Sequence, residues 1–183
     1  MNRYCVFLRG VNVNGVSVKI AALREAFWAM GYPGAKTALA SGNVIVSLED
    51  GADIGAHKAK IERGLSAAFS YGAHVLLRSE AELASLIETA GKVSVPEGCH
   101  LYALFIEGPE ALAALEDGFS AASHGPDERL ISMEKDAFWI VKKGGTLDTE
   151  FSKKVLGRRL KSALTSRNIN TVQKVAAMMA KRP

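Results

Sequence analysis

The chain has 183 residues, of which 48% are hydrophobic and 23% charged, with a formal net charge of +4. This length and apolar content suffice for one large or two small packed domains. No window of eighteen unbroken apolar residues occurs, and the short apolar run near the N-terminus is followed at once by Arg9. We therefore expect a cytoplasmic protein with no signal peptide and no membrane partner.

The first half of the chain predicts a β-α-β-β-α-β order of elements. Apolar residues recur at helical spacing in two segments, and β-compatible runs flank the Ser41-Gly42 turn. The expected elements are a strand at 5–8, a helix at 17–30, strands at 36–40 and 43–48, a helix at 54–71 and a strand at 74–78. A third helix should follow, since Ser79 and Glu82 form a capping box ahead of an apolar stripe that ends at Gly91.

Residues 92–99 contain Pro and Gly without a helical period, so the chain is expected to divide there into halves at 1–92 and 93–183. The second half restarts with β-α-β-β, at 100–106, from Pro109, at 129–133 and at 137–141, and ends with helices near 150–156 and 171–180, the latter capped by Thr171. The fold class is therefore α+β. We expect two ferredoxin-like (βαββαβ) halves in tandem, each an antiparallel sheet with helices packed on one face, and basic helices at the C-terminus.

The basic side chains are unevenly distributed. Residues 151–183 hold nine Lys or Arg and no Asp or Glu, whereas the rest of the chain holds 14 basic and 19 acidic side chains. This basic segment could dock as a solvated helix face on the acidic remainder, or it could bind the phosphates of a nucleic acid.

Metal and cofactor chemistry have no sequence signal. The two cysteines and four histidines lack metal-ligand spacing, and neither GxGxxG nor GxxxxGK[ST] is present. We therefore expect no metal and no cofactor, and we identify no catalytic residue.

Three polar clusters lie where strands and helices begin or end. They are Arg9, Gly10, Asn12, Asn14 and Gly15; Ser41, Gly42 and Asn43; and Thr165, Ser166, Arg167, Asn168, Asn170 and Thr171. Arginine, asparagine and the amides at a helix N-terminus can hold an anion. The same residue types are also what turns and helix caps require, whether or not anything binds.

Four segments, FLRGVNVNG, LREAF, ALASGNVIVS and TSRNINTVQKV, resemble the family of domain of unknown function 1697. The resemblance extends from Tyr4 to about Met178, and Ile169 stands where the family typically has Trp. It implies a compact bacterial cytoplasmic protein of two ferredoxin-like halves, with no established activity. It also implies that the polar residues of the three clusters are used together.

The leading hypothesis is a binding module for an anionic, phosphate-bearing ligand, either a nucleotide or a nucleic acid. Its expected site residues are Arg9, Asn12, Asn14, Ser41, Asn43, Thr165, Arg167 and Asn168, with the two arginines as charge partners. This hypothesis requires the clusters to converge in space. Two alternatives remain open: a metal-independent enzyme acting on a small metabolite in the same cleft, or a structural or interaction protein in which the clusters are only turns and caps.

Overall fold

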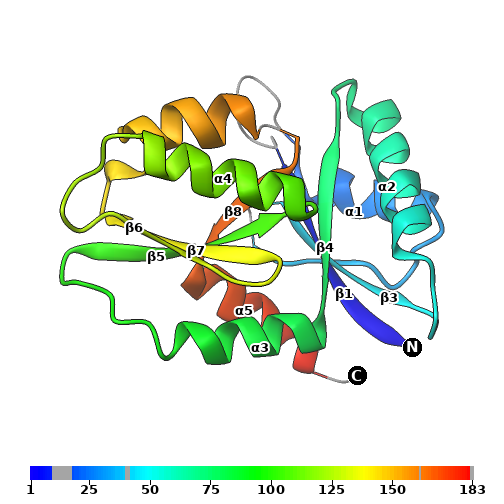
Figure 1. The fold of residues 1–183 in the computed structure, drawn as a ribbon. Coiled ribbons are helices and arrows are strands. Elements are labelled where there is room, and N and C mark those ends of the chain that lie inside the picture. The colour runs from blue at the N-terminus through cyan, green and yellow to red at the C-terminus, as the bar shows by residue number, and fades with distance from the viewer. Residues whose placement is uncertain (10–17, 40–41, 161, 182–183) are drawn as a thin grey trace. The chain divides into compact units, whose positions relative to one another are not determined.

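The computed structural model of the chain describes residues 1–9, 18–39, 42–160 and 162–181 (Figure 1). The protein is α+β, with two four-stranded antiparallel sheets and helices. It forms two compact units. Unit 1 comprises Met1–Leu86 together with Gln173–Pro183, and unit 2 comprises Ile87–Val172. The expected division at 92/93 differs from this, because it placed the C-terminal residues with the second half.

Unit 1 contains the first sheet. Its elements are β1 (Asn2–Arg9), α1 (Ile20–Ala29), β2 (Lys36–Thr37), β3 (Asn43–Leu48), α2 (Ile54–Phe69) and β4 (His74–Ser79). The strands lie in the order β2-β3-β1-β4, and every neighbouring pair is antiparallel. The sequence predicted this order of elements along the chain. Strand β2 is shorter than expected because Leu39 has a φ of 61°, a left-handed conformation in which a strand cannot continue.

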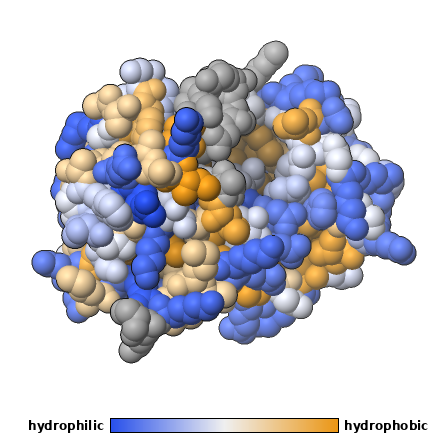
Figure 2. All heavy atoms as spheres, turned by 180° about the vertical axis from the view of Figure 1, so that it is seen from behind, coloured by the Kyte–Doolittle hydropathy of each residue, from blue (hydrophilic) through white to orange (hydrophobic). Residues whose placement is uncertain are grey.

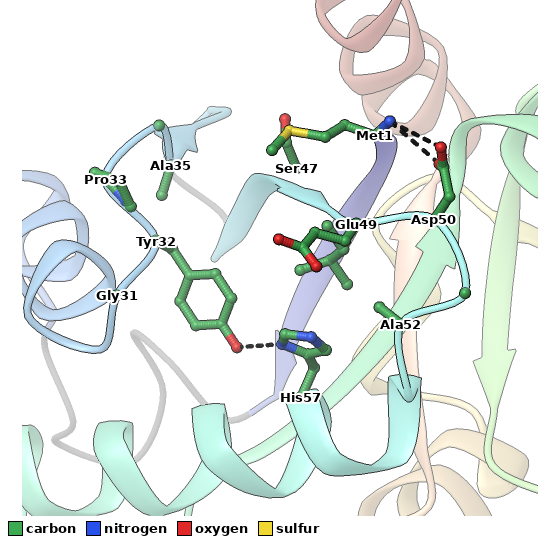
Figure 3. A pocket seen from close by; sticks show the side chains of 13 residues that line it. Met1, Gly31, Tyr32, Pro33, Ala35, Ser47, Glu49, Asp50, Ala52 and His57 are labelled. Atoms are coloured by element: carbon green, nitrogen blue, oxygen red, sulfur yellow. Dashed lines mark hydrogen bonds and ion pairs between the residues drawn. The ribbon is translucent and has the colours of Figure 1, made fainter.

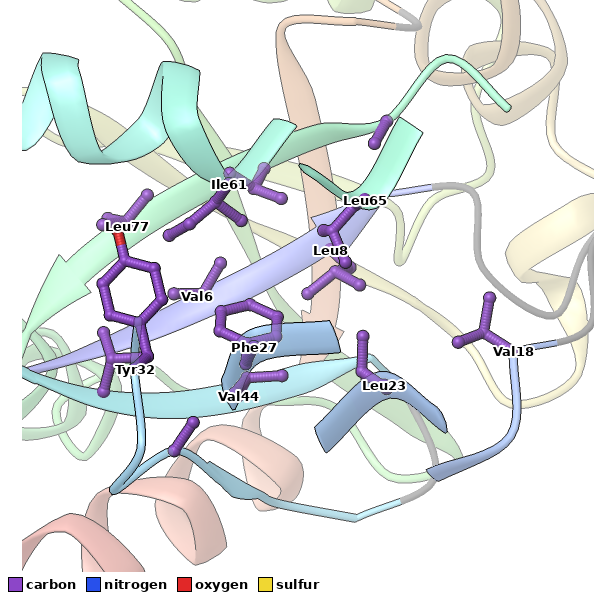
Figure 4. Packing of buried hydrophobic residues seen from close by; sticks show 14 of the residues in the cluster. Val6, Leu8, Val18, Leu23, Phe27, Tyr32, Val44, Ile61, Leu65 and Leu77 are labelled. Carbon is purple, nitrogen blue, oxygen red and sulfur yellow. The ribbon is translucent and has the colours of Figure 1, made fainter. Parts of the chain in front are cut away.

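One face of this sheet packs on α1 and α2. Val6 of β1 and Val44 of β3 lie on this face and are fully buried, as are Phe27 of α1 and Ile61 and Leu65 of α2. Figure 4 shows the side chains of the two helices directed toward those of the strands. Each helix has its apolar residues on one stripe, and burial of that stripe against the sheet holds the helix in place.

The opposite face of the first sheet is also buried, which differs from the expectation of an antiparallel sheet covered on one face. Cys5, Phe7 and Leu76 on that face are at most 6% exposed. Arg3, on the same face by strand alternation, donates a hydrogen bond to the carbonyl of Met179 and another, of 2.9 Å, to the carbonyl of Lys181. The C-terminal residues therefore belong structurally with β1.

Unit 2 contains the second sheet, in the order β6-β7-β5-β8. Its elements are β5 (Cys99–Ile106), α4 (Pro109–Ala121), β6 (Arg129–Ser132), β7 (Asp136–Lys142), the 3₁₀ turn η1 (Gly145–Leu147), the π-helix η2 (Ser152–Arg159) and β8 (Leu164–Asn168). Trp139 and Phe151 are central to its core, and the indole nitrogen of Trp139 donates to the buried carboxylate of Glu128 at 3.0 Å. Helices α3 (Glu80–Ala90) and α5 (Ile169–Ala180) lie at the two junctions between the units in the chain.

The basic C-terminal segment has a strand between its two helices, which differs from the expectation of helices alone. It forms the π-helix η2, the strand β8 and the helix α5, and β8 was not predicted. Strand β8 pairs antiparallel with β5, so that Ala103 lies opposite Arg167 and Phe105 opposite Thr165. The polar sequence of β8 is typical of a turn or cap, and its pairing with a buried strand decides its conformation.

Candidate functional site

Arg9 of the first polar cluster and Gly42 and Asn43 of the second lie at the same end of the first sheet. The register of β1 and β3 places Phe7 opposite Asn43, and the amide of Leu8 donates to the carbonyl of Gly42 at 2.8 Å. Arg9, the last residue of β1, is therefore next to the turn that precedes β3. Of the other expected site residues, Asn12, Asn14 and Ser41 lie outside the described residues.

Arg9 is a half-buried cation at this end of the sheet. Burial lowers the pKa of its guanidinium, because desolvation disfavours the charged form. On the other side of β1, Arg9 lies directly opposite His74 of β4. A partly desolvated arginine interacts more strongly with an anion than a fully solvated one does, because water screens the charge less.

Asn43 has a local structural role. Its side chain is fully buried, and its amide nitrogen donates to the carbonyl of Ala38 at 3.0 Å. In return, the backbone amide of Ala38 donates to the carbonyl of Asn43 at 2.8 Å. Asn43 thus closes the connection between β2 and β3. Of the two roles that the sequence left open, ligand binding and turn formation, this is the second.

The third cluster, in unit 2, also has local partners. Arg167 Nη1 donates to the hydroxyl of Thr165 at 2.9 Å and to the carbonyl of Ser166 at 2.8 Å. The side-chain oxygen of Asn168 accepts the amide of Asn170 at 3.0 Å, so Asn168 is the residue that caps α5. The expected cap, Thr171, is wrong because the helix begins two residues earlier, at Ile169.

The expected site residues are divided between the two units. Arg9 and Asn43 belong to unit 1, and Thr165, Arg167 and Asn168 belong to unit 2. Within unit 1, Arg9 lies close to Gly42 and Asn43. A single site that also includes the third cluster stays a prediction.

The basic segment is divided in the same way. Lys153 and Lys154 are exposed on η2 in unit 2, whereas Lys174 and Lys181 are exposed in unit 1. Lys154 donates to Glu150, and this hydrogen bond holds the pKa of the Glu150 carboxyl below its usual value. These lysines thus do not form one continuous helix face.

A pocket in unit 1 was not expected from the sequence. It has a volume of about 670 Å³ and lies between the connection from α1 to β2 and the start of α2. At its wall the hydroxyl of Tyr32 and Nδ1 of His57 are 2.8 Å apart, joined by the hydrogen bond drawn in Figure 3. Tyr32 is only 6% exposed, and burial raises the pKa of its phenol.

No pattern in the sequence predicts this pairing, because the two residues are 25 positions apart on different elements. His57 was a lone histidine without ligand spacing, and Tyr32 followed the end of a helix. One local cue was available: Asp53 accepts the amide of Ala56 at 3.0 Å as the cap of α2, which puts His57 in the first turn of that helix. That cue places the histidine but not the tyrosine.

Within the described residues, no three His, Cys, Asp or Glu side chains are grouped so that they could hold a metal ion. In the same part of the chain, no helix is both long enough and apolar enough to cross a bilayer. On the face drawn in Figure 2, hydrophobic residues form small groups among hydrophilic ones.

Comparison with known proteins gives a family and a fold. A family model described as "Protein of unknown function (DUF1697)" matches residues 1–138. A solved structure of a conserved bacterial protein from Streptococcus pneumoniae is similar to this chain with a TM-score of 0.78 and 20% identity, covering 99% of each chain. None of the curated proteins matches. At this identity the structural similarity shows a shared fold alone.

Proposed function

We propose that this chain, which belongs to the DUF1697 family of proteins of unknown function, is a binding module for an anionic, phosphate-bearing ligand at the Arg9 end of the first sheet. The observation that carries the proposal is the register of β1 and β3. It brings the half-buried Arg9 beside the Gly42 turn, although the two are more than thirty residues apart in sequence.

Arg9 supplies the charge in this proposal. Its guanidinium can form two parallel hydrogen bonds to one phosphate, which a lysine cannot do. The proposal does not depend on Arg167, which lies in unit 2 and whose Nη1 donates to Thr165 and to the carbonyl of Ser166. Asn43 acts by closing the turn and not as a ligand contact, since its side chain is buried and donates to Ala38.

A nucleotide or another small phosphorylated molecule is favoured over a nucleic acid. A nucleic acid would need a continuous row of cations that follows its phosphate backbone. The exposed lysines of the basic segment are divided between η2 in unit 2 and the C-terminal residues of unit 1. As far as the structure describes it, the basic segment therefore offers no single helix along which a phosphate backbone could run, and this supports a compact ligand.

We also propose a finer description of the fold and a location. Each sheet has its first strand at the centre, flanked by its third and fourth, with the second strand outermost beside the third. This order is the basis for classing each unit as a ferredoxin-like half and the whole as a tandem duplication. A cytoplasmic location is proposed from the sequence, and fractionation of cells that express the protein would test it.

The test is a thermal-shift screen of the full chain with inorganic phosphate, nucleoside mono- and triphosphates, sugar phosphates and a single-stranded oligonucleotide. A ligand at one hundred times its dissociation constant adds about 2.7 kcal/mol to the free energy of unfolding. For a chain of this size that raises the melting temperature by about 5–10 °C. Binding of the oligonucleotide that weakens steeply with salt would instead favour a nucleic acid.

Three variants show whether Arg9 is responsible. Arg9→Gln should abolish the shift, Arg9→Lys should keep part of it, and Arg63→Gln, at an exposed arginine on α2, should leave it unchanged. The stability of each variant without ligand is measured separately, so that a loss of binding is distinguished from a loss of folding. No stabilisation by any phosphate, or an unchanged shift in Arg9→Gln, would overturn the proposal.

A further inference from the structure

The pocket beside Tyr32 and His57 carries a second, different inference. We propose that it binds a small organic amine, whose ammonium group pairs with the carboxylate of Glu49 while His57 donates a hydrogen bond to an acceptor atom of the same molecule. This site uses no residue of the proposed phosphate site. Its outcome is therefore independent of that proposal.

The charge of the pocket favours a cation. Two carboxylates line it, those of Glu49 and Asp50. Asp50 is paired with the amino group of Met1, at 3.2 Å, whereas Glu49 makes no side-chain hydrogen bond or ion pair with any residue that the structure describes. Figure 3 shows the Glu49 carboxylate turned toward the same space as the Tyr32–His57 pair. One carboxylate in this concave site thus lacks a counter-charge.

A phosphate is disfavoured by the same groups. Glu49 and Asp50 are exposed, so water screens their charge in part, but like charges within a few ångströms still repel. Lys60 is a cation near Tyr32, and its Nζ lies 5.1 Å from the centroid of the Tyr32 ring. Lys60 is not one of the residues that line the pocket. The pocket itself is therefore suited to an ammonium group.

The Tyr32–His57 hydrogen bond orients the imidazole in the pocket. In the arrangement that we propose, the phenol of Tyr32 donates to Nδ1 of a neutral His57. A neutral imidazole that accepts at Nδ1 has its hydrogen on Nε2. His57 can then donate from Nε2 to an oxygen or nitrogen of the bound molecule.

The size and lining of the pocket suit a small molecule. A volume of about 670 Å³ is within the range of small-ligand pockets, which is about 300–1,000 Å³. Apolar side chains of Pro33, Ala35, Leu48 and Ala52 line the rest of it. A short carbon chain between an ammonium group and an acceptor group would contact these side chains.

The test is a nuclear magnetic resonance titration of the full, ¹⁵N-labelled chain with three four-carbon probes: putrescine, 4-aminobutyrate and succinate. The two amines should shift the amide signals of residues 31–32, 34–35, 49–52 and 57 in a saturable way, and succinate should not. The probes are taken to about 10 mM, ten times the dissociation constant of a weak, millimolar complex. Inorganic phosphate serves as the second anionic control.

Variants locate the charge. Glu49→Gln keeps the size of the side chain and should weaken binding of both amines about tenfold or more. The matched control is Glu25→Gln, at an exposed glutamate on α1, which should change nothing. Tyr32→Phe should weaken 4-aminobutyrate about fivefold and change the imidazole ¹⁵N shifts of His57, since the hydrogen bond that selects its tautomer is lost.

Three results would overturn the inference. The first is that no amine shifts the pocket signals at this concentration. The second is that succinate or phosphate shifts the same signals as strongly as the amines do. The third is that Glu49→Gln binds both amines as well as the original chain does.

Discussion

Replacing Asn43 with Ala distinguishes a structural asparagine from one that contacts a ligand. The substitution removes the donor from the carbonyl of Ala38, a residue that is itself fully buried. Leaving a buried carbonyl without its hydrogen bond costs about 1–3 kcal/mol. With a cost of about 2 kcal/mol, the melting temperature should fall by about 4–8 °C for a chain of this size.

The assay combines a thermal melt followed by circular dichroism with hydrogen exchange at one amide. The backbone N–H of Ala38 donates to Asn43 at 2.8 Å, so its exchange reports opening of this connection directly. A loss of 2 kcal/mol should speed that exchange about thirtyfold. Asn2→Ala, at an exposed position in β1, is the control and should stay within about 0.5 kcal/mol of the original chain. Asn43→Ala that behaves like Asn2→Ala would refute the reasoning.

Three further predictions concern other parts of the chain. Ser79→Ala removes the hydroxyl that accepts the amide of Glu82 at 3.2 Å, and urea denaturation should show a loss of about 1 kcal/mol; an unchanged midpoint would contradict the capping role. Gly118→Ala would place a Cβ 2.7 Å from a methyl group of Val155, so it should destabilise by about 1–3 kcal/mol, and shortening Val155 to Ala should recover part of that loss in the double variant. Burial raises the pKa of Tyr32 in the folded state from 10.0, so above about pH 10 this tyrosine loses its proton more readily in the unfolded state. The free energy of unfolding should therefore fall as the pH rises, and it should fall less steeply in Tyr32→Phe.

The elements of the first half were predictable because their signals are local. An apolar stripe at helical spacing locates α1 and α2 whatever the rest of the chain does. The capping box was equally readable: the amide of Ser79 donates to the Glu82 carboxylate at 2.7 Å, as the two residue types and their spacing predicted. Membership of the DUF1697 family was also indicated by short motifs and is confirmed.

Strand β8 and the Tyr32–His57 pair could not be predicted in this way, because both depend on partners distant in sequence. Thr165 and Arg167 are polar residues that form a strand only because β5 is there to pair with them. The tyrosine and histidine approach each other only after α2 has packed on the sheet. Local sequence also suggested that Asn43 would contact a ligand, whereas burial gives it a partner within the connection.

The hydrogen bonds from Arg3 to the end of α5 bear on the order in which the two units fold during synthesis. Unit 1 starts with β1 but is completed only by residues from Gln173 onward, whereas unit 2 is one uninterrupted stretch, Ile87–Val172. The ribosome therefore finishes unit 2 while the first sheet still lacks its last segment. Domains usually fold in the order in which they are made, from the N-terminus. We expect the opposite order here. Unit 2 should fold first, and the N-terminal sheet should reach its final packing last, after the end of α5 has left the ribosome.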